Sequence, residues 1–172
     1  MNIPHKPRFE HAKHIGRTFY NSLNIKSYPI DPIQIVYHMN WKFEIDDLCG
    51  EEGYTFYNPR TDNYCIVIDN TQSVRRQRCK FTIAHEIGHI VMNHYNCYDI
   101  DNLTDEAYHI LDVEADIVAG EILMPYISLR RTNNSNIISL ANLYDVSHSA
   151  METRLRFLNL YDCIIREEMK SM

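Results

Sequence analysis

Several features are missing from this sequence of 172 residues, and each absence excludes a class of protein. No apolar run approaches the roughly 18 residues that a membrane-spanning helix requires, and the first ten residues lack the apolar centre of a signal peptide. The five cysteines are an odd number without a Cys-x-x-Cys motif, so we expect free thiols in a reducing compartment rather than a disulfide framework. These absences predict a cytoplasmic protein that is neither secreted nor inserted in a membrane.

Positive charge is also scarce. The net charge of −6 and the sequence pI of 5.8 argue against direct nucleic-acid binding through the overall field of the protein, since such domains are usually basic. There is no internal repeat and no low-complexity segment. The length predicts a single domain over residues 1–172, with a catalytic core at 1–128 and a helical C-terminal subregion at 137–160.

The most informative stretch is the motif His85-Glu86-Ile87-Gly88-His89. On an α-helix a spacing of four residues turns the chain by about 400° and raises it by about 6 Å, so His85 and His89 stack on one face and can reach the same cation. Glu86 lies about 100° around the helix, where it can serve as general base for a metal-activated water. Random order would produce such a motif in this composition with a probability of about 3 in 100.

The surroundings of the motif strengthen this interpretation. Residues 74–92 are apolar on more than one side, which is typical of a buried helix, and a buried helix should not carry unpartnered polar groups. The sequence therefore predicts one Zn²⁺ with His85 and His89 as metal ligands and Glu86 as the catalytic residue.

The remaining pattern predicts an α+β fold, a mainly helical core with a small, mostly antiparallel sheet beside the metal helix. Residues 93–104 are polar and predict a loop. Three residues have the character of helix N-caps, namely Asp31, Thr104 and Ser147. Helices are expected at 8–23, 32–40, 74–92, 105–124, 137–144 and 148–158, and strands at 41–46, 54–57 and 64–68.

A catalytic zinc needs a third protein ligand. His94 follows His89 by five residues rather than the six of the elongated metalloprotease motif, and Cys97 lies in a polar segment, so both are weak candidates. Three carboxylates on the next helix are better placed, because the intervening loop lets that helix fold back across the first. They are Asp112, Glu114 and Asp116, and spacing alone does not choose between them.

Three motifs in a fixed order resemble the ImmA/IrrE family of zinc metallopeptidases. The resemblance covers roughly residues 30–160, and its one departure is Val118, where the family usually has phenylalanine. The motifs are Cys79-Lys80-Phe81-Thr82-Ile83-Ala84-His85-Glu86-Ile87-Gly88-His89, then Glu114-Ala115-Asp116 with Leu123-Met124-Pro125, then Tyr144-Asp145-Val146-Ser147 with Ala150-Met151 and Arg154-Leu155.

This resemblance implies a zincin-like fold of the gluzincin type, with Glu114 as the third metal ligand and a substrate lying beside an edge strand at Tyr64–Ile68. It also implies a site-specific endopeptidase. Some relatives carry a helix-turn-helix domain in the same chain, for which this chain has no room. We therefore expect the substrate to be a separate helix-turn-helix repressor, as in phages and integrative elements.

The alternative is a non-catalytic, zinc-dependent regulator or sensor with a helix-turn-helix-like C-terminal part. In that case Arg154 and Arg156 would contact phosphates, although Glu152 lies on the same helix. A peptidase also needs a group that stabilises the oxyanion. The candidates are Tyr126, His109 and His148.

Overall fold

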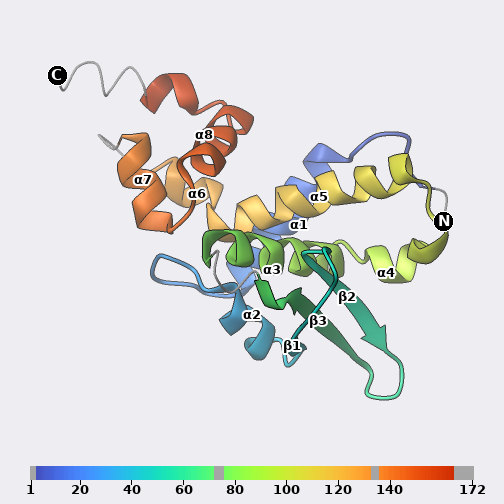
Figure 1. Cartoon of the computed structure of the whole chain (residues 1–172). Coiled ribbons are helices and arrows are strands. Elements are labelled where there is room, and N and C mark those ends of the chain that lie inside the picture. Colours follow the sequence, from blue (N-terminus) through green and yellow to red (C-terminus); the bar gives the residue numbers. More distant parts are fainter. Residues whose placement is uncertain (1–2, 72–75, 133–135, 165–172) are drawn as a thin grey trace.

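The computed structural model describes residues 3–71, 76–132 and 136–164, and it confirms the α+β class (Figure 1). The described helices are α1 (Phe9–Ser22), α2 (Pro32–His38), α3 (Arg76–Val91), α4 (His94–Cys97), α5 (Asp105–Leu123), α6 (Tyr126–Leu129), α7 (Ile137–Tyr144) and α8 (His148–Phe157), with a 3₁₀ turn at Ile100–Asn102. The strands are β1 (Lys42–Asp46), β2 (Gly53–Asn58) and β3 (Asn63–Asp69).

Local capping explains where several helices begin. The side chains of Asp31, Thr104 and Ser147 accept backbone N–H bonds from Ile33, Ala107 and Ala150, so all three predicted N-caps are confirmed. Met124-Pro125 ends α5 as expected. The predicted start of the metal helix at residue 74 lies outside the described residues.

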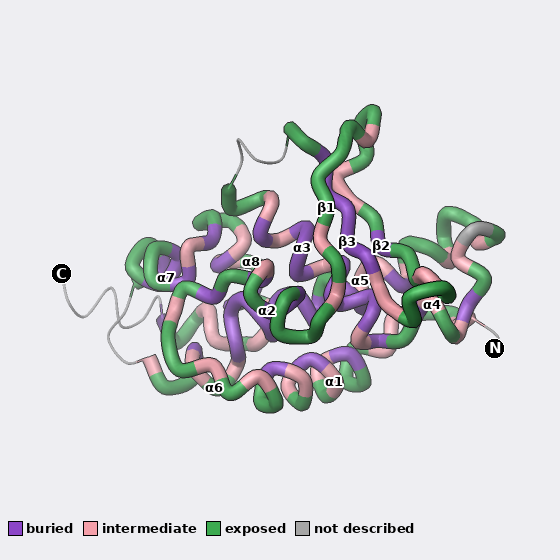
Figure 2. Tube along the Cα trace, turned by 90° about the horizontal axis from the view of Figure 1, so that it is seen from below, coloured by how far each residue is buried: buried purple, intermediate pink, exposed green. Residues whose placement is uncertain are grey.

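The sheet has the order β1-β3-β2, and it is mixed rather than mostly antiparallel, because β1 pairs with β3 in parallel and only β2 pairs with it antiparallel. Strand β3 is central, so the prediction of an edge strand at Tyr64–Ile68 is wrong. Figure 2 shows β3 buried between two more exposed strands. The alternating pattern predicted for β1 holds in part, because Phe43 packs against the core whereas Ile45 is 60% exposed.

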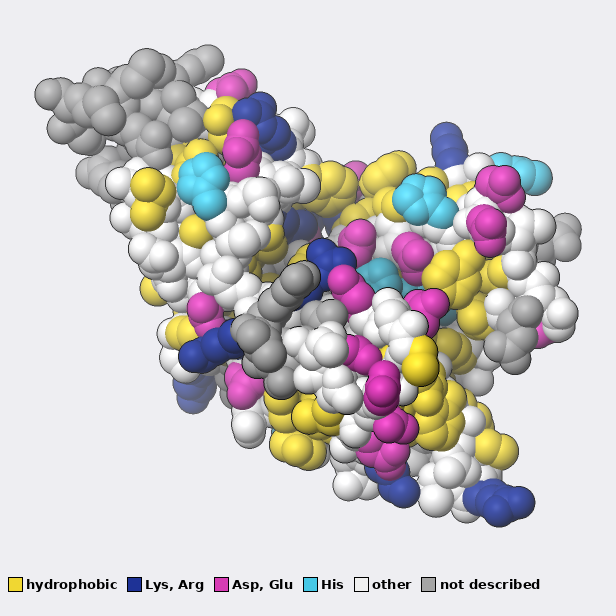
Figure 3. Space-filling view, viewed as in Figure 1, with side chains coloured by type: hydrophobic (Ala, Val, Ile, Leu, Met, Phe, Trp, Pro, Cys, Tyr) yellow, Lys and Arg dark blue, Asp and Glu magenta, His cyan; other side chains and the backbone are white. Residues whose placement is uncertain are grey.

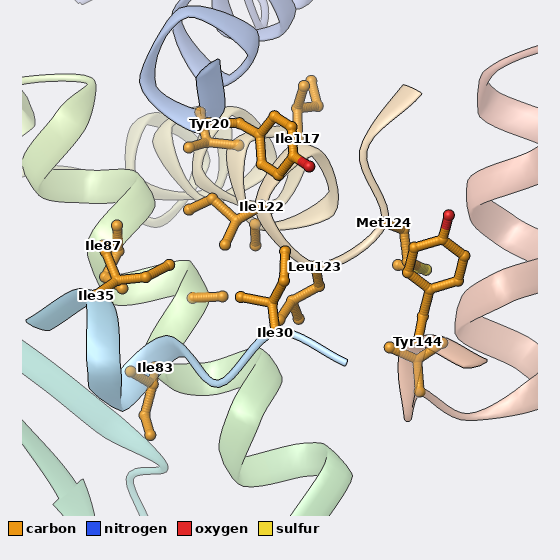
Figure 4. Close-up of a cluster of buried hydrophobic side chains, with 14 of the residues drawn as sticks. Tyr20, Ile30, Ile35, Ile83, Ile87, Ile117, Ile122, Leu123, Met124 and Tyr144 are labelled. Atoms are coloured by element: carbon orange, nitrogen blue, oxygen red, sulfur yellow. The ribbon is translucent and has the colours of Figure 1, made fainter. Parts of the chain in front are cut away.

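The core is organised by α3 and α5, which lie side by side in both Figure 1 and Figure 2. Gly88 allows this close packing, because a Cβ there would lie 2.6 Å from the backbone oxygen of Ala115. Apolar side chains of α1, α2, α3 and α5 fill the space around this contact, and Tyr144 of α7 closes one end of the cluster (Figure 4). The His-Glu-x-x-His motif therefore lies on a closely packed pair of helices.

Residues 93–104 contain more order than the predicted loop. Asn93 adopts a left-handed conformation (φ 61°), which ends the path of α3 and begins the short helix α4 at a fully buried His94. Within the described residues, no helix is long and apolar enough to cross a membrane.

Candidate metal centre

His85 and His89 of α3 meet Asp112 of α5 at one point between the two helices. The two Nε2 atoms lie 3.1 Å apart, and the Asp112 Oδ1 atom lies 3.3 Å from Nε2 of His89 and 3.7 Å from Nε2 of His85. Three atoms that can act as metal ligands therefore converge, all within 4.8 Å of one another.

These separations suit a small cation. Zinc bonds of about 2.0–2.1 Å in tetrahedral geometry place neighbouring donor atoms about 3.3 Å apart. The Oδ1 atom of Asp112 is also buried and has no hydrogen-bond partner within the described part of the chain, which an isolated carboxylate oxygen should avoid. Burial alone would raise the pKa of Asp112, but the adjacent imidazoles hold it below its usual value. The donor set therefore fits a zinc ion.

Asp116 orients the first of these ligands. Its Oδ1 atom lies 2.7 Å from Nδ1 of His85, so Nδ1–H donates to the carboxylate and Nε2 faces the donor triangle. Burial would lower the pKa of His85, but the neighbouring carboxylates of Asp112 and Asp116 raise it to about 10. A cation bound at Nε2 would compete with a proton for this atom.

The structure does not bring Glu114 to the donor triangle. Its side chain is fully buried, and it accepts hydrogen bonds from the backbone N, Nε and Nη2 of Arg8 at 2.7, 2.9 and 2.7 Å. His94 Nε2 lies 3.2 Å from its other face. Burial would raise the pKa of Glu114, but the bonds from Arg8 and His94 lower it to about 2, so the carboxylate is ionised.

The rotation of α5 explains this placement. Asp112 and Asp116 are one turn apart and share the face toward His85, whereas Glu114 lies about 200° around the helix from Asp112. The three carboxylates are thus a metal-facing pair and a buried partner of Arg8. Which face of α5 meets α3 is a property of the packed helices, which the spacing of residues did not reveal.

Glu86 is 5% exposed and follows His85 on α3. The hydroxyl of Tyr95 donates to its Oε2 atom at 3.4 Å, and the ring of Tyr108 stacks on His89 with centroids 6.3 Å apart. Burial raises the pKa of Tyr95 and, with nearby carboxylates, that of Tyr108 to about 12, so both hydroxyls stay protonated. No motif in the sequence pointed to these two tyrosines.

The three residues considered for the oxyanion lie elsewhere. Tyr126 is in α6, where its ring packs on Arg17 and its backbone N–H donates to Glu121. His109 is an exposed residue of α5, and His148 is the exposed first residue of α8. None of them belongs to the contacts described above for the donor triangle.

A sequence model of the family described as the IrrE N-terminal-like domain, Peptidase_M78, matches residues 43–156. This match covers both metal-facing helices and continues into α8. The chain belongs to this family. Membership supports a metallopeptidase-like protein and agrees with the ImmA/IrrE resemblance of the sequence.

Among solved structures, the fold of this ImmA/IrrE family member is similar to that of a Mycobacterium tuberculosis transcriptional regulator. The sequences are 17% identical, the TM-score is 0.56, and the alignment covers 84% of this chain and 46% of the other. The chain therefore spans less than half of that protein, and the likeness shows the fold alone. Comparison with curated protein sequences finds no match.

Proposed function

We propose that this protein is a site-specific zinc endopeptidase that cleaves a separate helix-turn-helix repressor and so relieves repression. The observation that carries the proposal is the convergence of His85, His89 and Asp112, with the carboxylate of Glu86 on the same helix. We assign Asp112, in place of Glu114, as the third metal ligand. Glu114 then does not bind the metal, but contacts His94, which in turn contacts His89.

In this proposal His85, His89 and Asp112 would hold a zinc ion, which would supply Lewis-acid activation of water and of the scissile carbonyl. Glu86 accepts a proton from the attacking water and returns it to the leaving amine nitrogen, so the peptide bond breaks into an acid and an amine without another reactant. Tyr95 orients the Glu86 carboxylate through its hydroxyl. Asp116 keeps His85 in the tautomer that leaves Nε2 free.

Two surfaces support binding of a polypeptide. The outer edge of β2 lies next to α3, with Gly53 close to Thr82, and it can pair with an extended chain where the sequence had suggested β3. A groove of about 780 Å³ between α5 and α8 is lined in part by Asp116, the partner of His85. Figure 3 shows a hollow beside the C-terminal helices with hydrophobic side chains along it.

The regulator alternative is less well supported by α8. Arg154 is 4% exposed and pairs with Glu121 at 2.9 Å, so it does not offer its charge to a phosphate. Arg156 pairs with Glu152 on the same helix. The structural neighbour is named a transcriptional regulator. A role in gene regulation agrees with either function, because cleavage of a repressor also changes transcription.

The test is co-expression of this protein with a helix-turn-helix repressor encoded next to it, with a reporter under the repressor's promoter. We compare the parent with Glu86→Gln, which keeps the shape of the side chain but cannot accept a proton. Zinc content and folding should be unchanged, while cleavage falls by about 10²-fold or more. Glu106→Gln, at an exposed position in the first turn of α5, is the matched control and should cleave like the parent.

Two results contradict the proposal. If Glu86→Gln relieves repression as well as the parent and neither produces a repressor fragment, the protein is not a peptidase acting on that repressor. If His85→Ala protein, purified without added metal, retains as much zinc as the parent, the metal site is elsewhere.

A further inference from the structure

We infer that a buried hydrogen-bond chain, Arg8–Glu114–His94–His89, fixes the tautomer of His89 and so points its Nε2 lone pair at the metal. In this chain Glu114 and His94 are positioning residues, not ligands. The inference rests on the proposed metal centre and adds a function for two buried groups that catalysis does not use. It also connects the segment before α1 to the active site.

The carboxylate of Glu114 determines which atoms donate and which accept in this series of hydrogen bonds. Arg8 donates three hydrogen bonds to it, two of them from the guanidinium in the side-by-side geometry that Arg favours with carboxylates. An ionised carboxylate has only lone pairs to offer. The ring nitrogen of His94 that faces it, Nε2 at 3.2 Å, must therefore be the donor.

A proton on Nε2 determines the role of the other ring nitrogen. His94 is fully buried and lies on the same carboxylate as the Arg8 guanidinium, a setting that disfavours a second positive charge. In the neutral ring one nitrogen donates and the other accepts, so Nδ1 of His94 carries a lone pair. This atom lies 3.1 Å from Nδ1 of His89. The proton between the two rings must then belong to His89.

His89 therefore carries its proton on Nδ1 and its lone pair on Nε2. Nε2 is the atom that lies 3.3 Å from Asp112 and 3.1 Å from Nε2 of His85, so the free lone pair lies in the donor triangle. His89 has the same tautomer without metal, because its Nε2 lone pair can then accept a hydrogen bond from Nε2–H of His85. A histidine ligand is commonly oriented in this way by the hydrogen bond of its second nitrogen.

The direct test is the protonation state of each ring nitrogen, read from long-range ¹H–¹⁵N correlation spectra of the histidine side chains in the full chain. In the metal-free protein at neutral pH we expect His89 to be protonated on Nδ1 and His94 on Nε2. Zinc should leave both assignments unchanged and, within these two rings, should shift only the resonance of Nε2 of His89. A His89 protonated on Nε2, or a doubly protonated His94, would overturn the inference.

A pair of matched variants separates positioning from general stability. Glu114→Gln can turn either its oxygen or its NH₂ group toward His94, so it no longer dictates the tautomer, and zinc affinity should fall by about 10- to 100-fold. Glu121→Gln removes the other buried glutamate of α5, which is also held by an arginine of α1, and should leave zinc affinity unchanged.

The outcomes distinguish this inference from the proposed function. If His85→Ala abolishes zinc binding while Glu114→Gln binds zinc as tightly as Glu121→Gln, the metal centre stands and the chain does not support it. If Glu114→Gln costs more affinity than Asp112→Asn, Glu114 is a ligand itself and the inference fails. If the parent binds no zinc, the proposed function fails, and the tautomers of the metal-free protein still decide the inference.

Discussion

Helix α5 is anchored to the N-terminal helix at two similar points, and only one of them leads to the metal centre. Glu114 and Glu121 lie seven residues apart, both are buried, and each contacts an arginine at α1, Arg8 at its start and Arg17 within it. By sequence type, burial and first partner, the two glutamates are nearly equivalent.

They differ in their second partner. Glu121 contacts Arg154 of α8 and accepts the backbone N–H of Tyr126, and both are groups that only donate. Glu114 instead contacts His94, whose ring has a second nitrogen that accepts. A buried carboxylate that contacts only donors therefore stabilises the fold. One that contacts an imidazole also determines which nitrogen of that ring is protonated, and so affects the residue that the other nitrogen contacts.

We expect the largest effect on folding at the C-terminal end of α5, where Glu121 contacts Arg17 and Arg154. Arg154→Met removes one partner of a buried ion pair and leaves Arg17 as the charged partner of Glu121, so the free energy of unfolding should fall by about 3 kcal/mol. Urea unfolding of the zinc-loaded protein measures this loss. Zinc affinity of the folded protein should not change, which is the opposite of the expectation for Glu114→Gln.

The control is Arg156→Met, which breaks an exposed pair with Glu152 on the same helix. Its cost should stay within about 0.5 kcal/mol. If Arg154→Met costs no more than Arg156→Met, the two ends of α5 do not differ as the structure indicates.

At the other end of α5, Asp112→Asn should lower zinc affinity by more than about 100-fold, because it removes the charge of a ligand. Asp116→Asn should cost about 10- to 100-fold, since that carboxylate only orients His85. Asp105→Asn, in the first turn of the same helix, is the control and should bind zinc like the parent. Competition with a chelating dye gives the three affinities, and equal values for Asp112→Asn and Asp105→Asn would remove Asp112 from the centre.

The smallest effect concerns Asp145, which joins α7 to α3. Hydrogen bonding and ion pairing with Lys80, with a further contribution from Arg76, lower the pKa of Asp145 below its usual value. Its contribution to stability is therefore fully present above about pH 4 and is lost as the pH falls through the lowered native pKa. Asp145→Asn should cost at most about 1 kcal/mol at pH 7 and less at pH 2.

Unfolding curves at the two pH values test this expectation. Asparagine also tolerates the left-handed conformation of residue 145 (φ 51°), so the substitution removes charge without straining the turn. A loss of stability that is the same at both pH values would show that charge is not the cause.

Much of the local structure could be predicted from the sequence because it depends on neighbours along the chain. The caps at Asp31, Thr104 and Ser147 and the shared face of His85 and His89 need only the geometry of one helix. The mixed sheet could not be predicted in this way, since parallel pairing of β1 with β3 joins strands that are not adjacent in sequence.

The position of Asp112, the third ligand of the proposed metal centre, also depends on contacts between distant residues. Asp112 faces α3 because of how two helices pack, and Glu114 is occupied by Arg8, 106 residues away. His94 was set aside because it follows His89 by five residues. The one local signal for its position was Asn93, a residue type that tolerates the left-handed turn that directs the chain back toward the site.

Gly88 sets the distance between the two helices that carry the candidate metal ligands. A side chain at this position would meet the backbone of Ala115 at 2.6 Å, so the absence of a single methyl group sets how closely α3 and α5 approach. Asp112 lies on one of these helices and the two histidines on the other, and their separation determines the length of bond that the three donors can share. In the proposed centre, a preference for an ion with short bonds, such as zinc rather than calcium, would therefore be set by a residue that does not touch the ion.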